Sequence, residues 1–222
     1  MITLDYYFTP LSPWTYLGHD RVLALAKRTG ITLVAKPIDL GAKIFPQSGG
    51  LPFAQRPAQR LAYRLIELAR WRDFLGKPLT LKPKFFPVSD SLALKTIAAL
   101  QAIASASNNN HDLSLAIAGD IMKATWVDEK DASDQTVLDG ICRNHGVDLE
   151  QLADTRAVAQ SQLDINNADA ISANVFGAPW FVLKNTKLGS NADQHFWGQD
   201  RIDFLERAVA QMQTQAQAQA QT

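Results

Sequence analysis

The sequence contains very little cysteine. Cys142 is the only thiol in 222 residues, so the chain forms no internal disulfide and has no Cys-X-X-Cys pair to exchange electrons with a partner. Cys142 also stands in an apolar stretch beside Ile141, which favours a buried packing role over a reactive one. We therefore exclude dithiol redox chemistry and expect the protein to work in a reducing compartment, the cytoplasm.

An excess of charge of one sign and a long apolar run are also missing. Lysine plus arginine and aspartate plus glutamate each number 22, so no overall field attracts the chain to nucleic acid or to an anionic membrane. No run approaches the roughly 20 apolar residues that span a bilayer, and the N-terminus has no signal-peptide pattern. The four histidines show no metal-ligand spacing, so we expect no metal site. These absences leave a small molecule as the expected partner.

The first forty residues have an α/β pattern. Residues 2–8 are β-branched and aromatic and stop before Pro10, which predicts a short strand followed by a turn. Ser12 and the proline after it give a strong helix-start signal, because serine caps free N–H groups and proline suits the first helical position. Gly30 ends this helix, and residues 31–37 predict a second strand joined to the first by a parallel crossover.

The middle of the chain has a different character. Residues 41–174 contain long stretches at helical period and no strand signal. Strand character returns only at residues 181–183 and 195–197, and residues 200–212 predict a closing helix. Helix and strand signals are therefore divided between the middle of the chain and its two ends.

This division predicts a discontinuous α/β domain. Residues 1–40 and 175–213 form the α/β domain in this interpretation, and residues 41–174 form an inserted all-helical domain of ordinary size. Residues 214–222, mostly alternating alanine and glutamine, have little that packs and are expected to form a frayed, disordered tail.

Ser12 occupies a place where chemistry is possible without a charged side chain. Unpaired N–H groups and a partial positive charge at a helix N-terminus stabilise an anion or a thiolate. The hydroxyl can cap its own helix, or it can donate a hydrogen bond to a thiolate that a ligand brings. The residues alone leave both roles open, and the cap is the more ordinary one.

Three motifs near the two ends of the chain carry a family resemblance. They are Leu11-Ser12-Pro13-Trp14-Thr15-Tyr16-Leu17 after the aromatic strand Tyr6-Tyr7-Phe8, Val175-Phe176-Gly177-Ala178-Pro179, and Phe196-Trp197-Gly198-Gln199-Asp200-Arg201. With Thr125-Trp126-Val127 and the helical middle segment, they resemble the thioredoxin-like 2-hydroxychromene-2-carboxylate isomerases and kappa-class glutathione transferases. The resemblance covers nearly everything except the alanine and glutamine tail. It implies an enzyme with a thioredoxin-like, DsbA-like fold and a large helical insertion, commonly a homodimer.

The resemblance also implies a site that borrows its nucleophile. Thioredoxin relatives that exchange disulfides open their first helix with Cys-X-X-Cys, whereas the matching positions here are Ser12 and Thr15. The thiol then arrives as glutathione. In this interpretation Ser12 donates a hydrogen bond to the glutathione sulfur, while the helix end lowers the pKa of the thiol.

The second motif is expected to bind the middle of glutathione. The family resemblance places the cysteinyl part of glutathione against the backbone of Ala178. It also favours a cis peptide bond before Pro179, which turns the preceding carbonyl and N–H groups outward. A trans proline that merely starts the following strand is the alternative when the flanking match is ignored.

The third motif has two compatible interpretations. Gly198-Gln199-Asp200-Arg201 is an ordinary helix start with acidic charge favourably placed against the helix dipole. The resemblance adds that Gln199 and Asp200 face the γ-glutamyl end of glutathione. The ammonium of that end needs a carboxylate partner, and its carboxylate can accept from N–H groups at the helix start.

Other site residues come from the same resemblance. Arg60 is expected to contact the glycyl carboxylate of glutathione, whereas the other basic residues between Arg56 and Lys84 are interpreted as solvated charge on a helix surface. Lys43 matches a lysine that the isomerases use near the substrate carboxylate, although a surface lysine is usually only solvated. Trp14, with other aromatic residues near the site, is a candidate for the wall of an aromatic substrate's pocket.

The sequence departs from the family pattern in two places. Relatives often carry an asparagine in the loop that here reads Gly49-Gly50-Leu51-Pro52, and an aspartate where Thr9 stands. The first departure removes one expected glutathione contact. Both departures indicate an acceptor pocket that differs from that of the family's best-known members.

Three functions follow as hypotheses. The first is a glutathione-dependent isomerase of a conjugated aromatic acid such as 2-hydroxychromene-2-carboxylate, in which a thiolate adds to the unsaturated system, allows a bond to rotate and leaves again. The second is a kappa-like transferase that releases a stable glutathione conjugate. The third is a non-catalytic binding module that keeps the thioredoxin-like shape. Substrate assays separate the first two, and glutathione binding separates both from the third.

Overall fold

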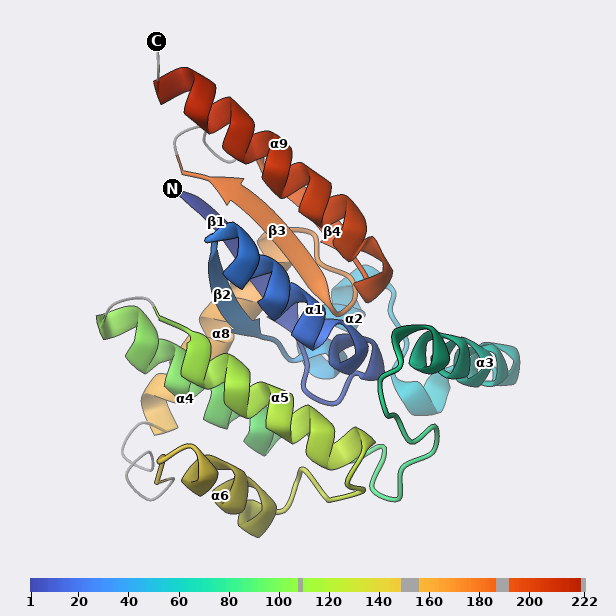
Figure 1. Cartoon of the computed structure of the whole chain (residues 1–222). Helices are drawn as coiled ribbons and strands as arrows, with labels where there is room; N and C mark the ends of the chain where they lie inside the picture. Colours follow the sequence, from blue (N-terminus) through green and yellow to red (C-terminus); the bar gives the residue numbers. More distant parts are fainter. Residues whose placement is uncertain (108–109, 149–155, 187–191, 221–222) are drawn as a thin grey trace.

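Four strands form a single sheet in the order β2-β1-β3-β4 (Figure 1). The computed structural model describes residues 1–107, 110–148, 156–186 and 192–220. The strands are β1 (Ile2–Phe8), β2 (Thr32–Pro37), β3 (Trp180–Asn185) and β4 (Gln194–Trp197). The longer helices of the described residues are α1 (Pro13–Thr29), α3 (Ala58–Leu75), α4 (Ser91–Ser107), α5 (Asp112–Trp126), α6 (Gln135–Asn144), α8 (Arg156–Ser172) and α9 (Ile202–Ala220). Short helical segments are η1 (Leu40–Ile44), α2 (Phe45–Ser48), η2 (Phe53–Gln55) and η5 (Gln199–Arg201).

The two ends of the chain meet in the centre of the sheet. Strand β1 pairs in parallel with β2 and antiparallel with β3, so that Tyr6 lies between Ala35 and Phe181. Strand β4 extends the sheet beside β3. The predicted strands and the parallel crossover through α1 are therefore confirmed, and the fold is a thioredoxin-like sheet with a large helical segment between β2 and β3.

Side chains of β1 enter two apolar clusters because alternate residues of a strand point to opposite faces. Tyr6 belongs to the larger cluster, which includes residues of α1, α5 and α9 and buries Leu17 and Val209. Tyr7 belongs to a smaller cluster with Ala170 of α8 and Trp180. Both faces of the central strand are therefore covered, as the mostly apolar sequence of residues 2–8 requires.

The helical segment shares its core with the sheet. Helices α3, α4, α5 and α6 contain the four stretches of helical period expected between β2 and β3. Buried Ile97 of α4, Ile121 of α5 and Trp126 belong to the same cluster as Tyr6 and Phe181 of the sheet. The insertion is therefore separate in chain order, but it packs directly on the α/β part.

Helix α9 is longer than the sequence pattern indicates. The closing helix was expected over residues 200–212 with a disordered tail from residue 214, but α9 runs from Ile202 to Ala220. Buried Leu205 and Val209 anchor its first half. Alanine and glutamine are good helix formers, and extending an existing helix needs no new nucleation. The prediction of a disordered tail is corrected as far as Ala220.

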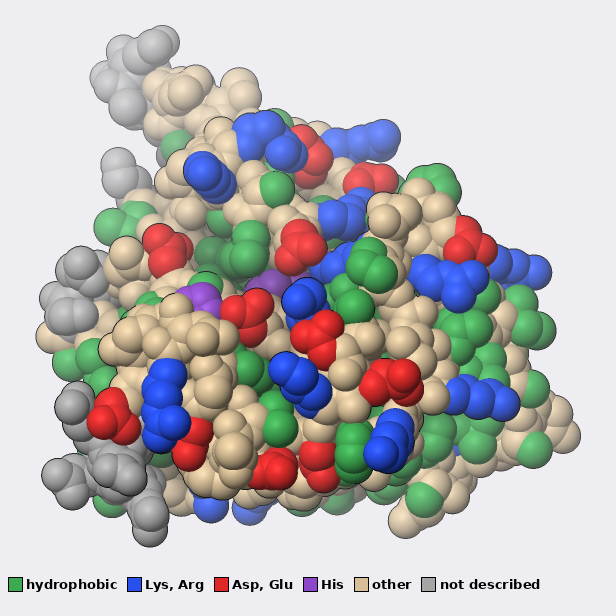
Figure 2. Space-filling view, turned by 60° about the horizontal axis from the view of Figure 1, so that its bottom comes forward, with side chains coloured by type: hydrophobic (Ala, Val, Ile, Leu, Met, Phe, Trp, Pro, Cys, Tyr) green, Lys and Arg blue, Asp and Glu red, His purple; other side chains and the backbone are tan. Residues whose placement is uncertain are grey.

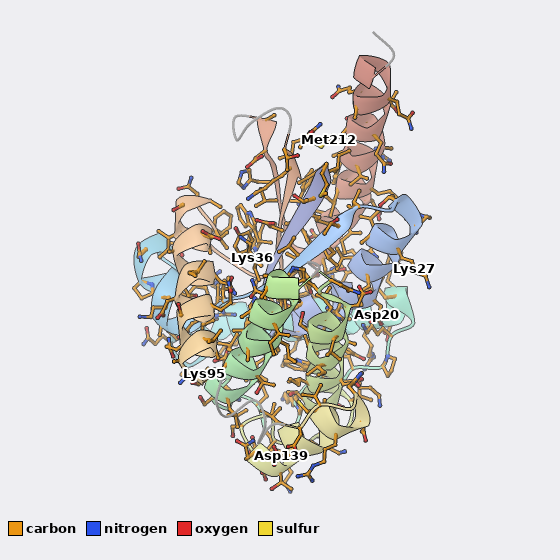
Figure 3. All side chains as sticks on the ribbon, turned by 90° about the vertical axis from the view of Figure 1, so that its left-hand side faces the viewer. Asp20, Lys27, Lys36, Lys95, Asp139 and Met212 are labelled. Carbon is orange, nitrogen blue, oxygen red and sulfur yellow. The ribbon has the colours of Figure 1, made fainter. Side chains whose placement is uncertain are left out.

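Charged side chains also lie inside the molecule. Asp5 of β1 forms ion pairs with Lys36 of β2 at 3.1 Å and Lys184 of β3 at 2.9 Å, and Lys36 reaches Asp169 of α8 at 2.6 Å. Figure 3 shows Lys36 between the sheet and α8. This ion-pair network joins three strands to a helix, and the sequence pattern does not reveal it.

The outer surface has mixed charge. On the face that Figure 2 shows, lysine and arginine side chains are interspersed with aspartate and glutamate, as the equal totals of the sequence lead us to expect. Within the part of the chain that the structure describes, no helix is long and apolar enough to cross a membrane.

Candidate active site

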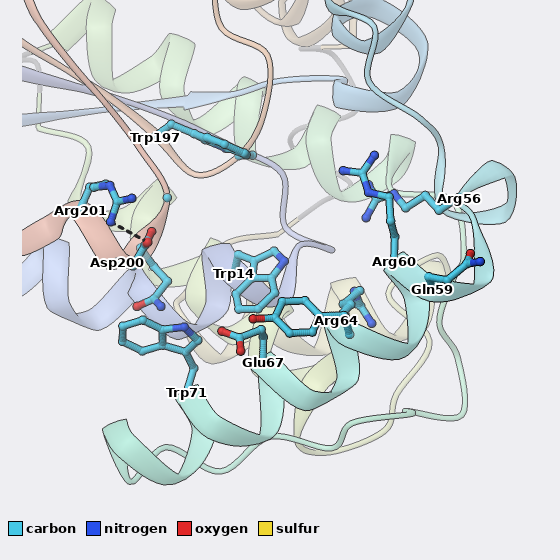
Figure 4. A pocket seen from close by; sticks show the side chains of 14 residues that line it. Trp14, Arg56, Gln59, Arg60, Arg64, Glu67, Trp71, Trp197, Asp200 and Arg201 are labelled. Carbon is cyan, nitrogen blue, oxygen red and sulfur yellow. Dashed lines mark hydrogen bonds and ion pairs between the residues drawn. The ribbon is translucent and has the colours of Figure 1, made fainter.

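A pocket of about 650 Å³ lies between the start of α1, one face of α3 and the turn that follows β4 (Figure 4). It is lined by Trp14, Arg56, Gln59, Arg60, Tyr63, Arg64, Glu67, Trp71, Ala178, Trp197, Gly198, Gln199, Asp200 and Arg201. Trp14 and six other residues that the family resemblance assigned to the site line this pocket. The tertiary structure thus brings together Arg60 and the two C-terminal motifs.

Ser12 stands beside this pocket as the N-cap of α1. Its Oγ accepts a hydrogen bond from the backbone N–H of Thr15 at 3.2 Å, and it donates to the carbonyl oxygen of Ala178 at 3.5 Å. The cap predicted from the sequence is therefore present. The bond to Ala178 is long for an O–H donor, so the hydroxyl proton is available for a stronger acceptor. The hydroxyl can cap the helix and donate to a ligand at the same time.

The peptide bond between Ala178 and Pro179 is cis, as expected from the motif. Ala178 lines the pocket, and its carbonyl oxygen is the one that faces Ser12. The carbonyl oxygen of Pro179 accepts from the N–H of Gly198 at 2.9 Å. This bond ties the loop before β3 to the turn after β4, so the second and third motifs form one continuous wall.

The turn after β4 depends on a glycine. Gly198 has a φ of +100°, and a Cβ there would lie 2.4 Å from Oδ1 of Asp200, so no other residue fits without displacing that carboxylate. Asp200 forms an ion pair with Arg201 at 2.8 Å. The carboxylate is thereby held at the rim of the pocket.

Gln199 is almost completely buried, and its side-chain amide contacts α1. It is 2% exposed, and its Oε1 accepts from Arg21 of α1 at 3.1 Å. Its Nε2 is buried and has no hydrogen-bond partner among the described residues. Gln199 therefore fixes the turn against α1, and it has one spare donor for an acceptor group next to the pocket.

One face of α3 lines the opposite side of the pocket. Arg60, Arg64, Glu67 and Trp71 are three or four residues apart, a spacing that places side chains on one helix face. Of this face, only Arg60 was expected at the site from the family resemblance. The spacing contained the missing signal, but only the packing shows that this face of the helix looks inward.

Arg64 corrects the prediction that the other basic residues near Arg60 are solvated. It is 9% exposed, and its guanidinium lies 5.2 Å from the ring centre of Phe53 and 5.3 Å from that of Phe86. Burial, together with the nearby charge of Arg56, lowers the pKa of Arg64 to about 10. The side chain therefore stays charged at neutral pH although it is removed from water.

The charges of the pocket are unevenly distributed. Arg56, Arg60 and Arg64 gather toward one end, whereas Asp200 and Arg201 lie at the other (Figure 4). Trp14 provides aromatic wall between the two ends, and Trp71 and Trp197 lie on the side of Asp200 and Arg201 (Figure 4). A ligand that carries a carboxylate at one end, an ammonium at the other and apolar surface between them matches this layout.

Arg56 contacts the loop in which relatives often carry an asparagine. Its Nε donates to the carbonyl oxygen of Leu51 at 2.9 Å, and its guanidinium lies 5.9 Å from the ring centre of Phe45. Gly50 is packed directly under that ring, since a Cβ there would lie 2.0 Å from a ring carbon. The changed loop therefore positions an arginine at the pocket.

The second departure from the family pattern is compensated by another part of the chain. Thr9 Oγ1 donates to Oδ2 of Asp90 at 2.7 Å. Asp90 is the residue directly before α4. The fold therefore places its carboxylate beside Thr9, in the loop that precedes Ser12. Burial raises the pKa of Asp90. Asp90 could not be expected here from the sequence, because Thr9 and Asp90 are 81 positions apart.

Several candidates lie outside the pocket. Lys43 is exposed on η1 and is not a lining residue, so its role stays a prediction. Tyr16 donates its hydroxyl to the carbonyl oxygen of Pro78 at 2.8 Å, and Trp180 is 7% exposed in the smaller apolar cluster. These two aromatic residues are part of the fold rather than of the pocket.

Cys142 is buried on α6, and burial raises its thiol pKa to about 11. Its predicted packing role is consistent with this position, because a buried thiol with a raised pKa is a poor nucleophile. Within the described ranges, no group of three or more His, Cys, Asp or Glu side chains is arranged to hold a metal ion.

Known proteins share both the sequence and the fold of this chain. The 2-hydroxychromene-2-carboxylate isomerase of Sphingobium xenophagum is 31% identical over 207 residues, which cover 92% of this chain and 96% of that protein. The enzyme of the same name from Pseudomonas putida is 28% identical over 214 residues, covering 94% and 95%.

Solved structures agree in fold. A 2-hydroxychromene-2-carboxylate isomerase matches with a TM-score of 0.74 at 23% identity, covering 97% of this chain and 98% of that one. The cytosolic disulfide reductase DsbM of Pseudomonas aeruginosa with GSH matches with a TM-score of 0.61 at 21% identity, covering 97% and 99%. Residues 3–210 also match the family model of the DSBA-like thioredoxin domain. The chain therefore belongs to the DSBA-like thioredoxin family and, within it, to the 2-hydroxychromene-2-carboxylate isomerases.

Proposed function

We propose that this protein is a glutathione-dependent isomerase of a conjugated aromatic acid such as 2-hydroxychromene-2-carboxylate. The observation that carries the proposal is the position of Ser12. Its hydroxyl caps α1 and lies 3.5 Å from the carbonyl oxygen before a cis proline, beside a pocket that contains no thiol of its own. The names of the sequence relatives support the reaction class.

Glutathione fits the residues of the pocket. In the proposal the γ-glutamyl end lies at the turn, where Asp200 offers a carboxylate for its ammonium and the spare Nε2 of Gln199 offers a donor for its carboxylate. The cysteinyl part pairs with the backbone of Ala178, and the glycyl carboxylate meets Arg60. The unpaired donor of Gln199 is the structural feature that favours a bound ligand at this turn.

Glutathione supplies a thiolate that adds reversibly to a conjugated system and so removes the double-bond character that blocks rotation. The protein's own residues hold this group in its reactive form. In the proposal the hydroxyl of Ser12 donates a hydrogen bond to the sulfur, which stays a thiolate, and the free N–H groups at the start of α1 favour negative charge there. Trp14 and Trp197 contribute apolar wall that limits water around the reacting atoms.

The activity test compares substrate isomerisation with and without glutathione. We expect 2-hydroxychromene-2-carboxylate to be converted to its isomer only when glutathione is present, with free thiol fully recovered at the end. Stoichiometric loss of thiol, with a stable conjugate formed, would favour the glutathione transferase alternative instead. Absence of glutathione binding in a calorimetric titration would reject both and favour the non-catalytic module.

We also propose that the protein is a homodimer, which the resemblance implies, in the cytoplasm, which its single cysteine favours. Ile66 and Phe74 of α3 are 49% and 79% exposed and provide apolar surface for contact between two copies. Light scattering of the purified chain measures this directly. A mass of one chain at micromolar concentration would contradict the dimer.

A further inference from the structure

We propose that Arg64 is a specificity-determining residue that binds the carboxylate of the aromatic substrate. Arg64 lines the pocket from the middle of α3 and is 91% buried, since 9% of its surface is exposed. That the carboxylate belongs to an aromatic substrate rests on the proposed function. That Arg64 binds an anion is argued from its surroundings alone.

Within the described residues, the guanidinium of Arg64 forms no ion pair, and its Nη2 is buried without a hydrogen-bond partner. Glu67, the acidic residue on the same face of α3, pairs with Arg70 instead. Arg56, a charged neighbour of Arg64, is repulsive. An unpaired buried charge is costly to folding, so an anion from outside the chain is the partner that this position lacks.

The surroundings of Arg64 are aromatic. Phe53, Phe86 and Trp126 place their ring centres 5.2, 5.3 and 5.8 Å from the guanidinium carbon. These rings stabilise the cation without neutralising it. The indole Nε1 of Trp126, which does not line the pocket, is also a buried donor without a partner in the described part of the chain. A guanidinium has donors and no acceptor, as an anion-binding position requires.

The arrangement selects a flat acid over other anions. Trp14 and Tyr63 line the same pocket as Arg64 and present aromatic surface to a planar ligand. An arginine fork pairs with a carboxylate through two parallel hydrogen bonds, which fixes its orientation as well as its charge. Arg60, which is exposed on the same helix face, remains available for the glycyl carboxylate of glutathione.

A binding experiment tests this without turnover. Cinnamate, a conjugated aromatic acid, and cinnamamide, its uncharged amide, are titrated calorimetrically into the protein with glutathione at saturation. We expect the wild type to bind the acid on the order of ten- to a hundredfold more tightly than the amide, the range for a charge-assisted hydrogen bond. Equal affinities in the wild type would overturn the proposal by themselves.

Variants test whether Arg64 is the source of the preference for cinnamate over cinnamamide. Arg64→Met is expected to remove this preference while leaving the affinity for glutathione unchanged. Arg64→Lys keeps the charge but not the two parallel donors, so it is expected to retain part of the preference. Arg72→Met is the matched control, because Arg72 lies on the same helix, pairs with Asp73 and does not line the pocket. It should behave as the wild type.

The remaining outcomes are equally decisive. Arg64→Met is expected to melt at or above the temperature of the wild type, because it removes a buried unpaired charge. If Arg64→Met weakens glutathione and not cinnamate, the carboxylate belongs to glutathione and the proposal is wrong. It is also wrong if Lys43→Met loses the preference and Arg64→Met keeps it. Failure of the isomerase assay alone leaves this binding result standing.

Discussion

At the scale of single residues, the hydroxyl of Ser12 caps α1 and keeps its proton for the ligand that we propose, so the two roles that the sequence left open are compatible. Its lone pair accepts from the N–H of Thr15, and its proton points toward the carbonyl oxygen of Ala178. A hydroxyl has both a donor and two acceptor sites, so capping and ligand binding do not compete. The two functions can nevertheless be separated by experiment.

Ser12→Ala is expected to cost about 1 kcal/mol of unfolding free energy, the usual value of an N-cap. It should also raise the pKa of the bound glutathione thiol, because the hydrogen bond to the thiolate is lost. Urea unfolding measures the first effect, and ultraviolet absorbance of the thiolate during a pH titration measures the second.

Asp134→Ala provides the control for this prediction. Asp134 caps α6 by accepting from the N–H of Thr136, and it does not line the pocket. A similar loss of stability is expected, with the thiol pKa unchanged. The same thiol pKa in Ser12→Ala and the wild type would reject the proposed role of Ser12.

At the scale of elements, the contact between α1 and η5 determines the shape of the pocket. Gly18 of α1 faces the turn, and a Cβ there would lie 2.7 Å from Cβ of Gln199 and 3.3 Å from Ile202. Arg21, one turn further along α1, donates to the carbonyl oxygen of Gln199 at 2.9 Å. The glycine thus allows the turn that holds Asp200 to approach the helix closely.

Gly18→Ala is expected to move the turn away from α1 and to lower stability by roughly 1–3 kcal/mol, as overpacking does. Glutathione affinity should fall with it, because Gln199 and Asp200 move together. Gly140→Ala in α6 is the matched control, since nothing lies within 4 Å of the added carbon. It should stabilise by roughly 0.5–1 kcal/mol through helix propensity. Unchanged glutathione affinity in Gly18→Ala would contradict the placement of the ligand at this turn.

The elements themselves were largely predictable from local pattern. Alternate residues of β1, from Ile2 to Phe8, pack in the larger apolar cluster, and the start of α1 has both a serine cap and a proline, so the limits of both elements are encoded locally. The inward orientation of α3 was not predictable. Its exposed and buried arginines, Arg60 and Arg64, are the same residue type, and only the packing of Phe53 and Phe86 distinguishes them.

At the scale of the whole molecule, His19 connects the sheet to the helical segment. Its ring nitrogen Nε2 donates to the carbonyl oxygen of Leu115 on α5 at 3.1 Å, so Nδ1 is the acceptor for the hydroxyl of Tyr6 at 3.2 Å. A side chain on Gly119 would crowd the imidazole, since a Cβ there lies 3.1 Å from the ring. Burial lowers the pKa of His19 to about 4.

Because His19 is buried in its neutral form, we expect the free energy of unfolding to fall in acid. The folded pKa is below the unfolded value of about 6.5, so the stability contribution is complete above about pH 6.5 and is lost as pH falls toward about 4. The largest loss from this group is roughly 3 kcal/mol. Urea unfolding of the wild type and of His19→Gln across this range measures it. At neutral pH the variant should have a lower free energy of unfolding than the wild type, and this free energy should change less with pH. Parallel pH profiles of the two proteins would contradict the prediction.

Local pattern in the sequence predicts the strands and the limits of α1, and the single cysteine excludes dithiol chemistry. These predictions depend on side-chain alternation, capping and residue type. The cis bond before Pro179, which is present, was expected only from the family resemblance, because the residues alone also allow a trans proline. The proposed roles of Ser12 and Asp200 come from the same resemblance.

Packing determines which charged side chains of α3 line the pocket and which carboxylate lies beside Thr9. Arg64 lies over the ring of Trp126 and Asp90 accepts from Thr9, although these neighbours are far away in sequence, and burial changes the pKa of Arg64 and of Asp90. The physical reason is that solvation and pairing depend on the packed surroundings, which no local pattern contains. Residue type fixes the available chemistry, and packing fixes where that chemistry is used.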